Sequence, residues 1–303
     1  MEVIRQFKAL SDLTRLRLLH ILNEVELNVN EIVSIVDMIQ SGVSRHLKIL
    51  LESGLLVARK EGSFMYYSAN THPDNQSLIQ LACSRVRADP LCALDIEKAR
   101  QIIMIRKNRT KRFFSTVAPQ WEGLKKEILG SFNLNHELTQ RIGTPQGIAD
   151  LGCGTGELLG RLVQNHSGVL IGVDASPEML EQARIKLPDI RSIELRLGEV
   201  EYLPMKDQEV DAVVMSMVLY HILQPEKAIQ EVFRVLRPGG IFLLADFEHH
   251  DQESIKDIIG GNWLGFEKSQ VETWLLKSGF QLQAMERFAV ERGLHIQLFS
   301  AEK

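Results

Sequence analysis

Residues 147–157 read Gly-Ile-Ala-Asp-Leu-Gly-Cys-Gly-Thr-Gly-Glu, and this stretch decides how the second half of the chain folds. A short apolar run precedes three glycines at alternate positions, Gly152, Gly154 and Gly156, and an apolar stripe at helical spacing follows them. The pattern predicts a buried strand, a tight turn and the start of a helix. Glycine is needed where such a turn approaches a ligand closely or adopts a positive φ. The free N–H groups of the helix start suit a polar or anionic ligand group.

The spacing of the glycines distinguishes two kinds of nucleotide-binding turn. A dinucleotide turn, Gly-x-Gly-x-x-Gly, would place its third glycine at position 157, where this chain has Glu157. The spacing here is Gly-x-Gly-x-Gly, and Asp150 precedes it. This pattern resembles motif I of the class I S-adenosylmethionine (SAM)-dependent methyltransferases. The resemblance implies that the chain binds SAM or the reaction product S-adenosylhomocysteine (SAH), and no metal is expected.

Four later segments, in the expected order, strengthen this resemblance. They are residues 174–179 (DASPEM), 197–201 (LGEVE), 216–221 (SMVLYH) and 235–240 (VLRPGG). Ligands of open α/β sheets bind outside the carboxyl ends of the strands, so polar groups at those ends matter most. Asp174 ends a predicted strand and its two oxygens suit the two ribose hydroxyls.

The resemblance assigns further roles around the same ligand. It implies that Met179 packs on the adenine ring, that Glu199 accepts from the adenine amino group, and that the Val200 backbone contacts a ring nitrogen. The full set of predicted cofactor-binding residues is Asp150, Gly152, Cys153, Gly154, Gly156, Asp174, Ala175, Met179, Gly198, Glu199, Val200, Ser216 and Met217.

The methyl-acceptor side carries a weaker pattern. Methyl transfer depends mainly on proximity and orientation, and it needs a base only when the nucleophile must lose a proton. His221 and His250 are the candidate catalytic residues, beside Asp246 and His249, although a lone histidine is more often a packed residue. An arsenite-methylating enzyme would need several reactive cysteines, and this part of the chain has only Cys153.

The first part of the chain has a different pattern. Helices are expected at 13–23, 29–36 and 40–53, followed by strands at 55–60 and 64–68 joined by a Glu61-Gly62-Ser63 turn. The segments FKALSDLTRLRLLHIL, SGVSRHLKILLESGLL and ARKEGSFMYYS resemble ArsR-type winged helix-turn-helix regulators.

This second resemblance implies a homodimer that binds a double-stranded DNA operator. Residues 40–53 would enter the major groove and the hairpin would contact the backbone or minor groove. The predicted DNA-binding residues are Gln40, Ser41, Ser44, Arg45, His46, Lys48, Arg59 and Lys60. Residues 27–31, where many such regulators hold metal-sensing cysteines, contain no thiol, so soft-metal sensing is not expected there.

Composition and charge agree with a fusion of two domains. The chain has 303 residues, 45% of them apolar, and three cysteines without a CxxC pair, which favours a reduced cytoplasmic protein. No stretch is long and apolar enough to span a membrane. Residues 1–118 contain 17 Lys and Arg against 12 Asp and Glu, whereas residues 119–303 contain 18 against 27. The basic part suits nucleic acid and the acidic part a small ligand.

The two resemblances together predict an α/β chain. The expected parts are a winged helix-turn-helix domain (1–88), a helical linker (89–120) and a Rossmann-like class I methyltransferase domain (121–303) with a mostly parallel seven-stranded sheet. In the linker helix we expect Leu94, Ile102 and Ile105 to be buried, with Met104 as a further candidate. We expect the basic run 106–112 to be a solvated face, the alternative being contact with DNA phosphates.

Two functions fit this organisation. The architecture resembles SAH-responsive ArsR-type regulators of methionine-cycle genes, in which SAH or SAM would be the effector that controls operator binding. The alternative is an active SAM-dependent methyltransferase for a small molecule, with an autoregulatory DNA-binding domain. A methyltransferase that acts on nucleic acid ranks last, because no Asn/Asp-Pro-Pro-aromatic type motif follows the fourth strand.

Overall fold

The computed structural model describes residues 2–187 and 193–303, with the side chain of residue 257 left out. The chain divides into two compact units, Met1–Arg106 and Lys107–Lys303, each of which is considered separately. The division falls inside the predicted linker, so the domain boundaries at 88 and 120 stay predictions. No helix in the described ranges is long and apolar enough to cross a bilayer.

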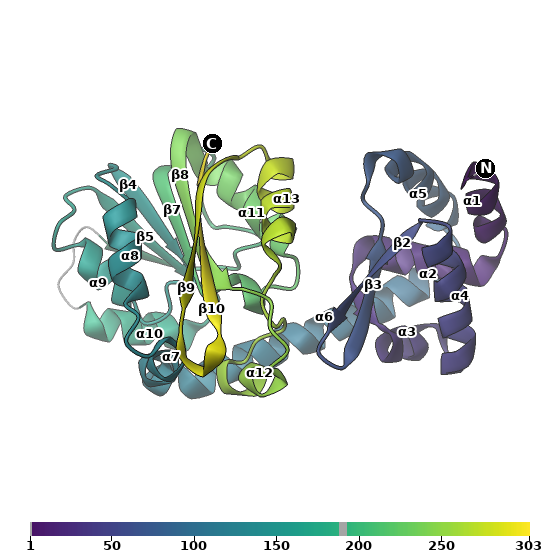
Figure 1. Cartoon of the computed structure of the whole chain (residues 1–303), viewed down its shortest axis with the longest axis horizontal. Helices are drawn as coiled ribbons and strands as arrows, with labels where there is room; N and C mark the ends of the chain where they lie inside the picture. The colour runs from purple at the N-terminus through teal and green to yellow at the C-terminus, as the bar shows by residue number, and fades with distance from the viewer. Residues whose placement is uncertain (1, 188–192) are drawn as a thin grey trace. The chain divides into compact units, whose positions relative to one another are not determined.

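The first unit consists of helices around a small antiparallel sheet (Figure 1). Its elements are α1 (Glu2–Leu10), α2 (Leu13–Glu24), β1 (Leu27–Asn28), α3 (Val29–Val36), α4 (Gln40–Glu52), β2 (Leu56–Glu61), β3 (Phe64–Ala69), α5 (Pro73–Val86) and the first part of α6 (Pro90–Val117). The strand order is β1-β3-β2, and β2 and β3 form the predicted hairpin. This is the helix, turn, helix and hairpin order expected from the sequence.

Local sequence signals explain where these helices begin and which face they bury. Asp12 caps α2 by accepting from the backbone N–H of Arg15 at 3.0 Å. Asn28 and Glu31 form a capping box at the start of α3. On α4 the spacing of Val43, Leu47 and Leu50 places all three in the core of the unit, so the polar side chains between them face outward.

The prediction for the apolar side chains of α6 was wrong at three positions. Leu94 is 51% exposed, Met104 58% and Ile105 68%, whereas Ile102 packs against the core. Phe7 on α1 is also largely exposed. Helical periodicity identifies an apolar face, but it does not tell whether that face meets the core of the same chain or remains exposed.

The second unit is a seven-stranded sheet with helices packed against it. The strands are β4 (Gly147–Leu151), β5 (Val169–Asp174), β6 (Ile193–Leu197), β7 (Val210–Ser216), β8 (Leu236–Phe247), β9 (Gln281–Ala289) and β10 (His295–Glu302). The helices after α6 are α7 (Trp121–Leu129), α8 (Leu134–Arg141), α9 (Glu157–Leu162), α10 (Pro177–Lys186), α11 (Pro225–Val235), α12 (Glu253–Ile259) and α13 (Lys268–Ser278). Short 3₁₀ turns cover Ala118–Gln120, Leu219–His221 and Glu291–Gly293.

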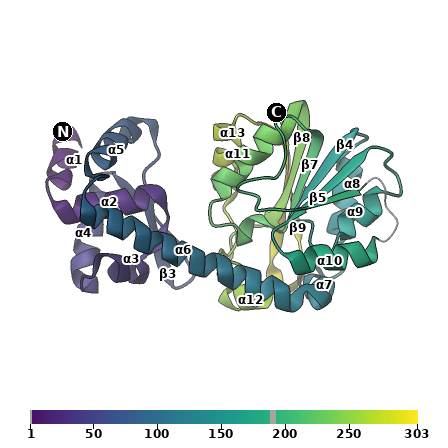
Figure 2. The ribbon, with the colours of Figure 1, turned by 180° about the vertical axis from the view of Figure 1, so that it is seen from behind.

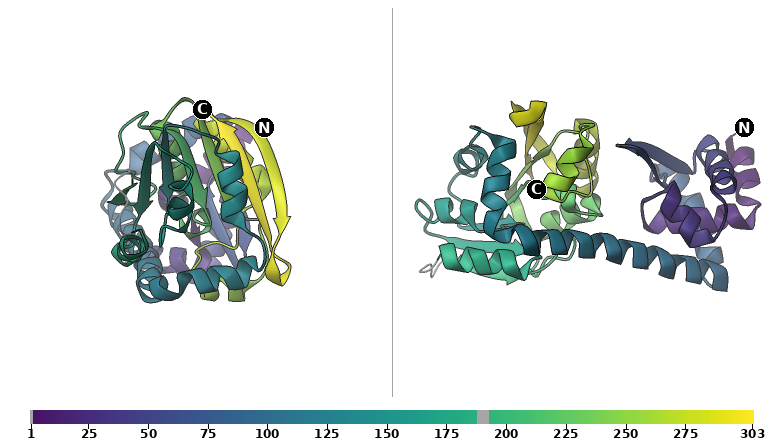
Figure 3. Two further views of the ribbon diagram at one scale, coloured as in Figure 1. Left: turned by 90° about the vertical axis from the view of Figure 1, so that its left-hand side faces the viewer. Right: turned by 90° about the horizontal axis from the view of Figure 1, so that it is seen from below.

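The order of the strands confirms the predicted sheet. They run β6-β5-β4-β7-β8-β10-β9; neighbours from β6 to β8 are parallel, and β10 is antiparallel to both β8 and β9. The last two strands lie side by side in yellow in Figure 3. Helix α10 packs on β5 and β6 (Figure 2). The order reverses direction at β4, where β5 lies on one side and β7 on the other, and a ligand crevice is expected at such a switch point.

Candidate functional site

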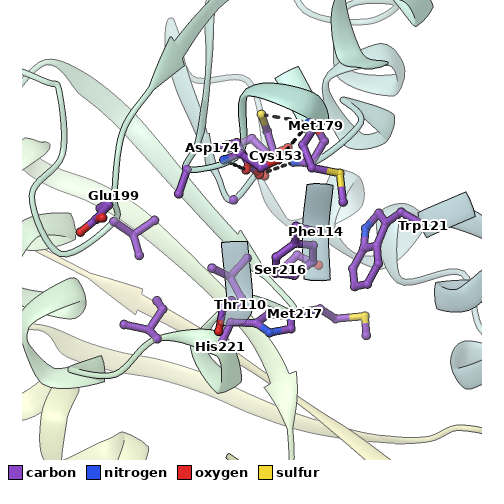
Figure 4. A pocket seen from close by; sticks show the side chains of 18 of the residues that line it. Thr110, Phe114, Trp121, Cys153, Asp174, Met179, Glu199, Ser216, Met217 and His221 are labelled. Atoms are coloured by element: carbon purple, nitrogen blue, oxygen red, sulfur yellow. Dashed lines mark hydrogen bonds between the residues drawn. The ribbon is translucent and has the colours of Figure 1, made fainter. Parts of the chain in front are cut away.

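A pocket of the second unit lies where β4, β5, β6 and β7 end, at the predicted switch point. It brings together segments that are far apart in the sequence (Figure 4). The predicted cofactor-binding residues that line it are Asp150, Gly152, Cys153, Gly154, Asp174, Ala175, Met179, Gly198, Glu199, Val200, Ser216 and Met217. Gly156 does not line the pocket. It is the N-cap of α9 in a left-handed conformation, with φ of 78°.

The glycine turn is shaped by close backbone approach. Gly152 has a φ of 69°, and a Cβ on it would lie 2.4 Å from Cγ2 of Val218. Such a contact cannot be accommodated without displacing the segment after β7. Gly154 also has a positive φ, and its backbone N–H donates to Oδ2 of Asp174 at 2.8 Å. The turn is thus packed against Val218 at Gly152 and held by Asp174 at Gly154.

Asp174 is fixed by the backbone on both oxygens. Its Oδ1 accepts from the N–H of Ser176 at 2.8 Å, and Oδ2 accepts from Gly154. Burial raises the pKa of Asp174, and these backbone N–H groups oppose the rise. The N–H of Ala175 is a third backbone group that favours the charged carboxylate, which lines the pocket.

Asp150 lies deeper, at the end of β4, and is 3% exposed. Burial raises its pKa to about 7; the charge of Lys125 opposes this rise, whereas Asp174 and Glu157 add to it. Lys125 itself forms an ion pair with Glu157 at the start of α9. This end of the pocket therefore offers carboxylates and one ammonium, which are the groups that bind the two charges of an amino acid.

At another part of the pocket, Glu199 is held by two lysines of α6. Its Oε2 accepts from Nζ of Lys107 at 2.6 Å, and its Oε1 accepts from Nζ of Lys111 at 3.2 Å. Burial disfavours the charged carboxylate, but the hydrogen bonds and charges of both lysines outweigh burial and lower its pKa. The interpretation of residues 106–112 as a solvated face was therefore wrong for Lys107, and also for Arg106, whose side chain is 12% exposed and pairs with Glu31, whereas Lys111 is 51% exposed.

Aromatic side chains form another part of the wall. Phe114 lies edge-on to Trp121, with ring centroids 5.3 Å apart, and edge-on to His221 at 4.7 Å. His221 Nδ1 lies 3.2 Å from the carbonyl oxygen of Gly260, which can only accept, so Nδ1 carries the proton. Its Nε2 is buried and has no hydrogen-bond partner among the described residues. Burial lowers the pKa of His221 to about 3, so the ring is neutral at physiological pH.

The other side chains proposed for chemistry lie differently. His250 does not line the pocket; its Nδ1 accepts from the backbone N–H of Gln252 at 3.2 Å. Asp246 is fully engaged by the backbone, since it accepts from the N–H groups of Val218, Leu219 and Phe247. Catalytic roles for His221 and His250 stay predictions.

Cys153 is a packed thiol. It is 7% exposed, and burial raises its pKa well above the ordinary value of a cysteine. A neutral thiol is a poor nucleophile and a poor soft-metal ligand. Burial therefore disfavours a nucleophilic or metal-ligating role for Cys153.

Some pocket residues were missed in the sequence. Lys107, Thr110, Lys111 and Phe114 follow one another at i, i+3, i+4 and i+7, so one face of α6 lines the pocket. Residues from α7 and α8, among them Trp121, Lys125 and Asn135, were missed as well. The only signal in the sequence was the likeness of FFSTVAPQW (113–121) to the segment before methyltransferase domains.

In the first unit, the predicted DNA-binding residues fall into two groups. Those exposed on the unit's surface are Gln40, Ser41, Ser44, Arg45 and Lys48 on α4, and Lys60 on β2. His46 is partly buried, with Nδ1 3.7 Å from Oδ1 of Asp12. Arg59 forms ion pairs with Glu26 at 2.9 Å and with buried Glu61. Contact with DNA stays a prediction for all eight.

Comparison with known families matches both parts of the chain. The bacterial regulatory protein arsR family matches residues 12–57, and the methyltransferase domain family matches residues 149–244. The chain joins an ArsR-family helix-turn-helix to a class I methyltransferase domain. The sheet order of the methyltransferase domain and the winged-helix order of the ArsR-type region agree with this assignment.

Individual relatives match this chain over part of their own length. An uncharacterized methyltransferase of Mycobacterium tuberculosis is 45% identical over 93 residues, which are 31% of this chain and 36% of the relative. An arsenite methyltransferase of Halobacterium salinarum is 35% identical over 103 residues, covering 33% of this chain and 26% of the relative. The chain thus spans about a third of the length of the first curated relatives it matches.

A solved structure with a bound product has the same fold. A Haemonchus contortus N-methyltransferase in complex with phosphomonomethylethanolamine and SAH aligns with a TM-score of 0.51 at 18% identity. The alignment covers 58% of this chain and 53% of that one. At this identity the likeness concerns the fold.

Proposed function

We propose that this chain is a cytoplasmic, dimeric transcriptional regulator, and that its methyltransferase domain binds SAH or SAM as an effector controlling operator binding. One observation carries the proposal. The residues predicted to contact an adenosyl ligand from four separate strand ends line one pocket, in a chain that also carries an ArsR-family helix-turn-helix. The fusion places the pocket and the DNA-binding region in one chain, so that a ligand in the pocket would control DNA binding.

The chemistry of the pocket fits SAH and SAM. Asp174, fixed on both oxygens by backbone N–H groups, would accept from the ribose hydroxyls. Asp150 and Lys125 would bind the ammonium and the carboxylate of the amino-acid part, since opposite charges favour each other in a partly desolvated site. Gly152 and Val218 both line the pocket, and the lack of a side chain on Gly152 lets Val218 pack against the turn.

The ArsR-type region would read DNA through α4. Arg45 and Lys48 are exposed there beside Ser41 and Ser44, and arginine suits guanine edges as well as phosphates. The exposed apolar side chains of α1, among them Val3, Ile4 and Phe7, are the proposed surface for a second copy of the chain.

The test is DNA affinity with and without ligand. A labelled duplex that the protein selects from a random library would be titrated with full-length protein, alone and with saturating SAH or SAM. A change of about five- to 150-fold in Kd with one of the two compounds supports the effector role, because allosteric couplings lie in that range. An unchanged Kd with both compounds, although calorimetry shows that they bind, rejects it.

An active methyltransferase is the alternative, and His221 favours it. Its neutral ring presents an unprotonated, unpartnered Nε2 in the aromatic wall formed with Phe114 and Trp121. Because burial lowers the pKa of His221 to about 3, this nitrogen is a weak base in the empty pocket, and it would serve as a hydrogen-bond acceptor that orients a hydroxyl or amine nucleophile. Sustained release of SAH from SAM in the presence of a small acceptor, abolished in His221→Phe, would establish the enzyme; a lack of turnover with SAM bound leaves the effector role.

A further inference from the structure

Helix α6 contacts Glu199, the carboxylate that is predicted to accept from the amino group of adenine. Lys107 and Lys111 lie one helical turn apart on the face of α6 that lines the pocket, and each donates to a different oxygen of Glu199. Both oxygens are thereby bonded to the chain itself. The same carboxylate is the one assigned to the 6-amino group of adenine. A ligand that enters the pocket must therefore share or take over these hydrogen bonds.

We propose that Lys107 and Lys111 form a latch on Glu199, and that the 6-amino group of the ligand's adenine opens it. The inference rests on the proposed function and names its regulation. When the adenine amine donates to Glu199, the two ammonium groups lose their best acceptor. Buried Glu201 lies close enough to Lys107 for their charges to interact, so it offers that lysine a second partner in the open state.

The position of Lys107 in α6 connects the latch to the ArsR-type region. The preceding residue, Arg106, is bonded within the ArsR-type region: its guanidinium pairs with Glu31 and donates to the carbonyl of Glu26 at 3.2 Å. Glu31 is also the capping-box residue of α3, the helix before α4. Helix α6 is continuous from Pro90 to Val117. The release of Lys107 from Glu199 therefore removes a restraint on α6 directly after Arg106, the residue that bonds this helix to α3 and its surroundings.

With this latch, the 6-amino group of adenine determines whether a bound ligand changes the affinity for DNA. An analogue with a carbonyl oxygen in place of the amine, S-inosylhomocysteine, presents an acceptor to Glu199 and cannot replace the lysines. We expect it to bind at least about tenfold more weakly than SAH, because its carbonyl oxygen cannot donate a hydrogen bond to Glu199. At saturating concentration it should leave the Kd for DNA unchanged. A shift equal to that caused by SAH would overturn the latch.

The second arm of the test removes the latch. In Lys107→Met/Lys111→Met the competing ammonium groups are gone, so SAH should bind roughly two- to tenfold more tightly, as expected for two partly exposed ion pairs. The SAH-induced change in DNA affinity should fall to less than about a third of the wild-type change. Lys126→Met, an exposed lysine of α7, is the matched control and should keep wild-type values for both. Circular dichroism and DNA affinity without ligand establish that the double variant is folded.

The outcomes separate the latch from the proposed function. If SAH shifts the DNA affinity of the wild type and shifts that of the double variant equally, with the same SAH affinity, the latch is wrong and the effector role stands. If SAH and SAM leave the wild-type DNA affinity unchanged, the effector role itself is wrong. Glu199→Gln gives an independent check, since the amide oxygen still accepts from adenine but no longer attracts the lysines. The SAH-induced change in DNA affinity should shrink in that variant, and a change as large as in the wild type or larger would also contradict the latch.

Discussion

Asp174 Oδ2 accepts the backbone N–H of Gly154 at 2.8 Å, so the carboxylate predicted for the ribose also holds the glycine turn. Its other oxygen accepts from Ser176, the N-cap of α10. One side chain thereby connects the end of β5 to the turn after β4 and to the start of the next helix. The ligand site and the local backbone are built on the same carboxylate.

Replacement of this carboxylate should abolish ligand binding. In Asp174→Ala we expect the affinity for SAH to fall at least about 100-fold, because two hydrogen bonds to a charged acceptor, each worth about 1.5–3 kcal/mol, are lost. The midpoint of thermal unfolding should fall as well, since Gly154 and Ser176 lose their acceptor. Calorimetry gives the affinity, and Asp207→Ala, at an exposed aspartate of the same unit, is the control expected to bind SAH normally.

The close approach at Gly152 predicts a severe effect from a single methyl group. Gly152→Ala combines a left-handed backbone, which costs about 1–3 kcal/mol, with a clash against Val218. Gly239→Ala is the matched control, because its φ is 75° but nothing lies within 4 Å of the added Cβ. Denaturant titrations should show a loss of stability about 1–3 kcal/mol larger for Gly152→Ala, the cost of overpacking. Equal losses of stability in the two variants would show that the turn and Val218 can move apart to accommodate the added methyl group.

Ligand affinity should depend on pH through Asp150. Burial raises the pKa of this carboxyl to about 7 in the empty pocket, whereas the ligand's ammonium would favour the ionised form. Binding then releases a proton below pH 7, so affinity for SAH should rise with pH, by up to about tenfold per unit, and level off above 7. Calorimetry between pH 5.5 and 8.5 measures this. In Asp150→Asn the dependence should flatten; an unchanged slope would mean that another group titrates.

Two arginines that look alike in the sequence should behave differently. Arg45 is exposed on α4, so Arg45→Ala should weaken DNA binding while leaving the thermal unfolding midpoint unchanged. Arg59 faces the fully buried Glu61 carboxylate and Glu26, so Arg59→Ala should reduce stability by about 3 kcal/mol. Differential scanning calorimetry and fluorescence anisotropy separate the two effects. Normal stability of Arg59→Ala would contradict a structural role for the ion pairs with Glu26 and Glu61.

The sequence predicted the fold and the strand-end side of the pocket because both follow from local patterns. Three local patterns predicted this side of the pocket: the glycine spacing, Asp174 at a strand end, and the LGEVE loop. Each follows a strand of the same sheet, so the sheet brings them together. The other wall of the pocket could not be predicted in this way. Lys107 and Lys111 look like any solvated basic run, and only the tertiary contact with Glu199, more than 80 residues away, reveals that they face a carboxylate.

The exposure of Leu94 and Ile105 has a related cause. Periodicity shows that a helix has an apolar face but contains no information about which surface that face meets. Likewise, Arg59 reads as a phosphate contact on a hairpin, while the structure surrounds it with Glu26 and Glu61. Errors of this kind occur where a charged or apolar side chain is partnered by a residue distant in sequence.

The affinity for SAH, measured by calorimetry on free protein and on protein saturated with its selected duplex, tests the central claim most directly. Linkage requires that DNA changes the Kd for SAH by the same factor by which SAH changes the Kd for DNA. The account predicts a factor of about five to 150, equal in both directions within error. The same Kd for SAH with and without DNA would contradict it.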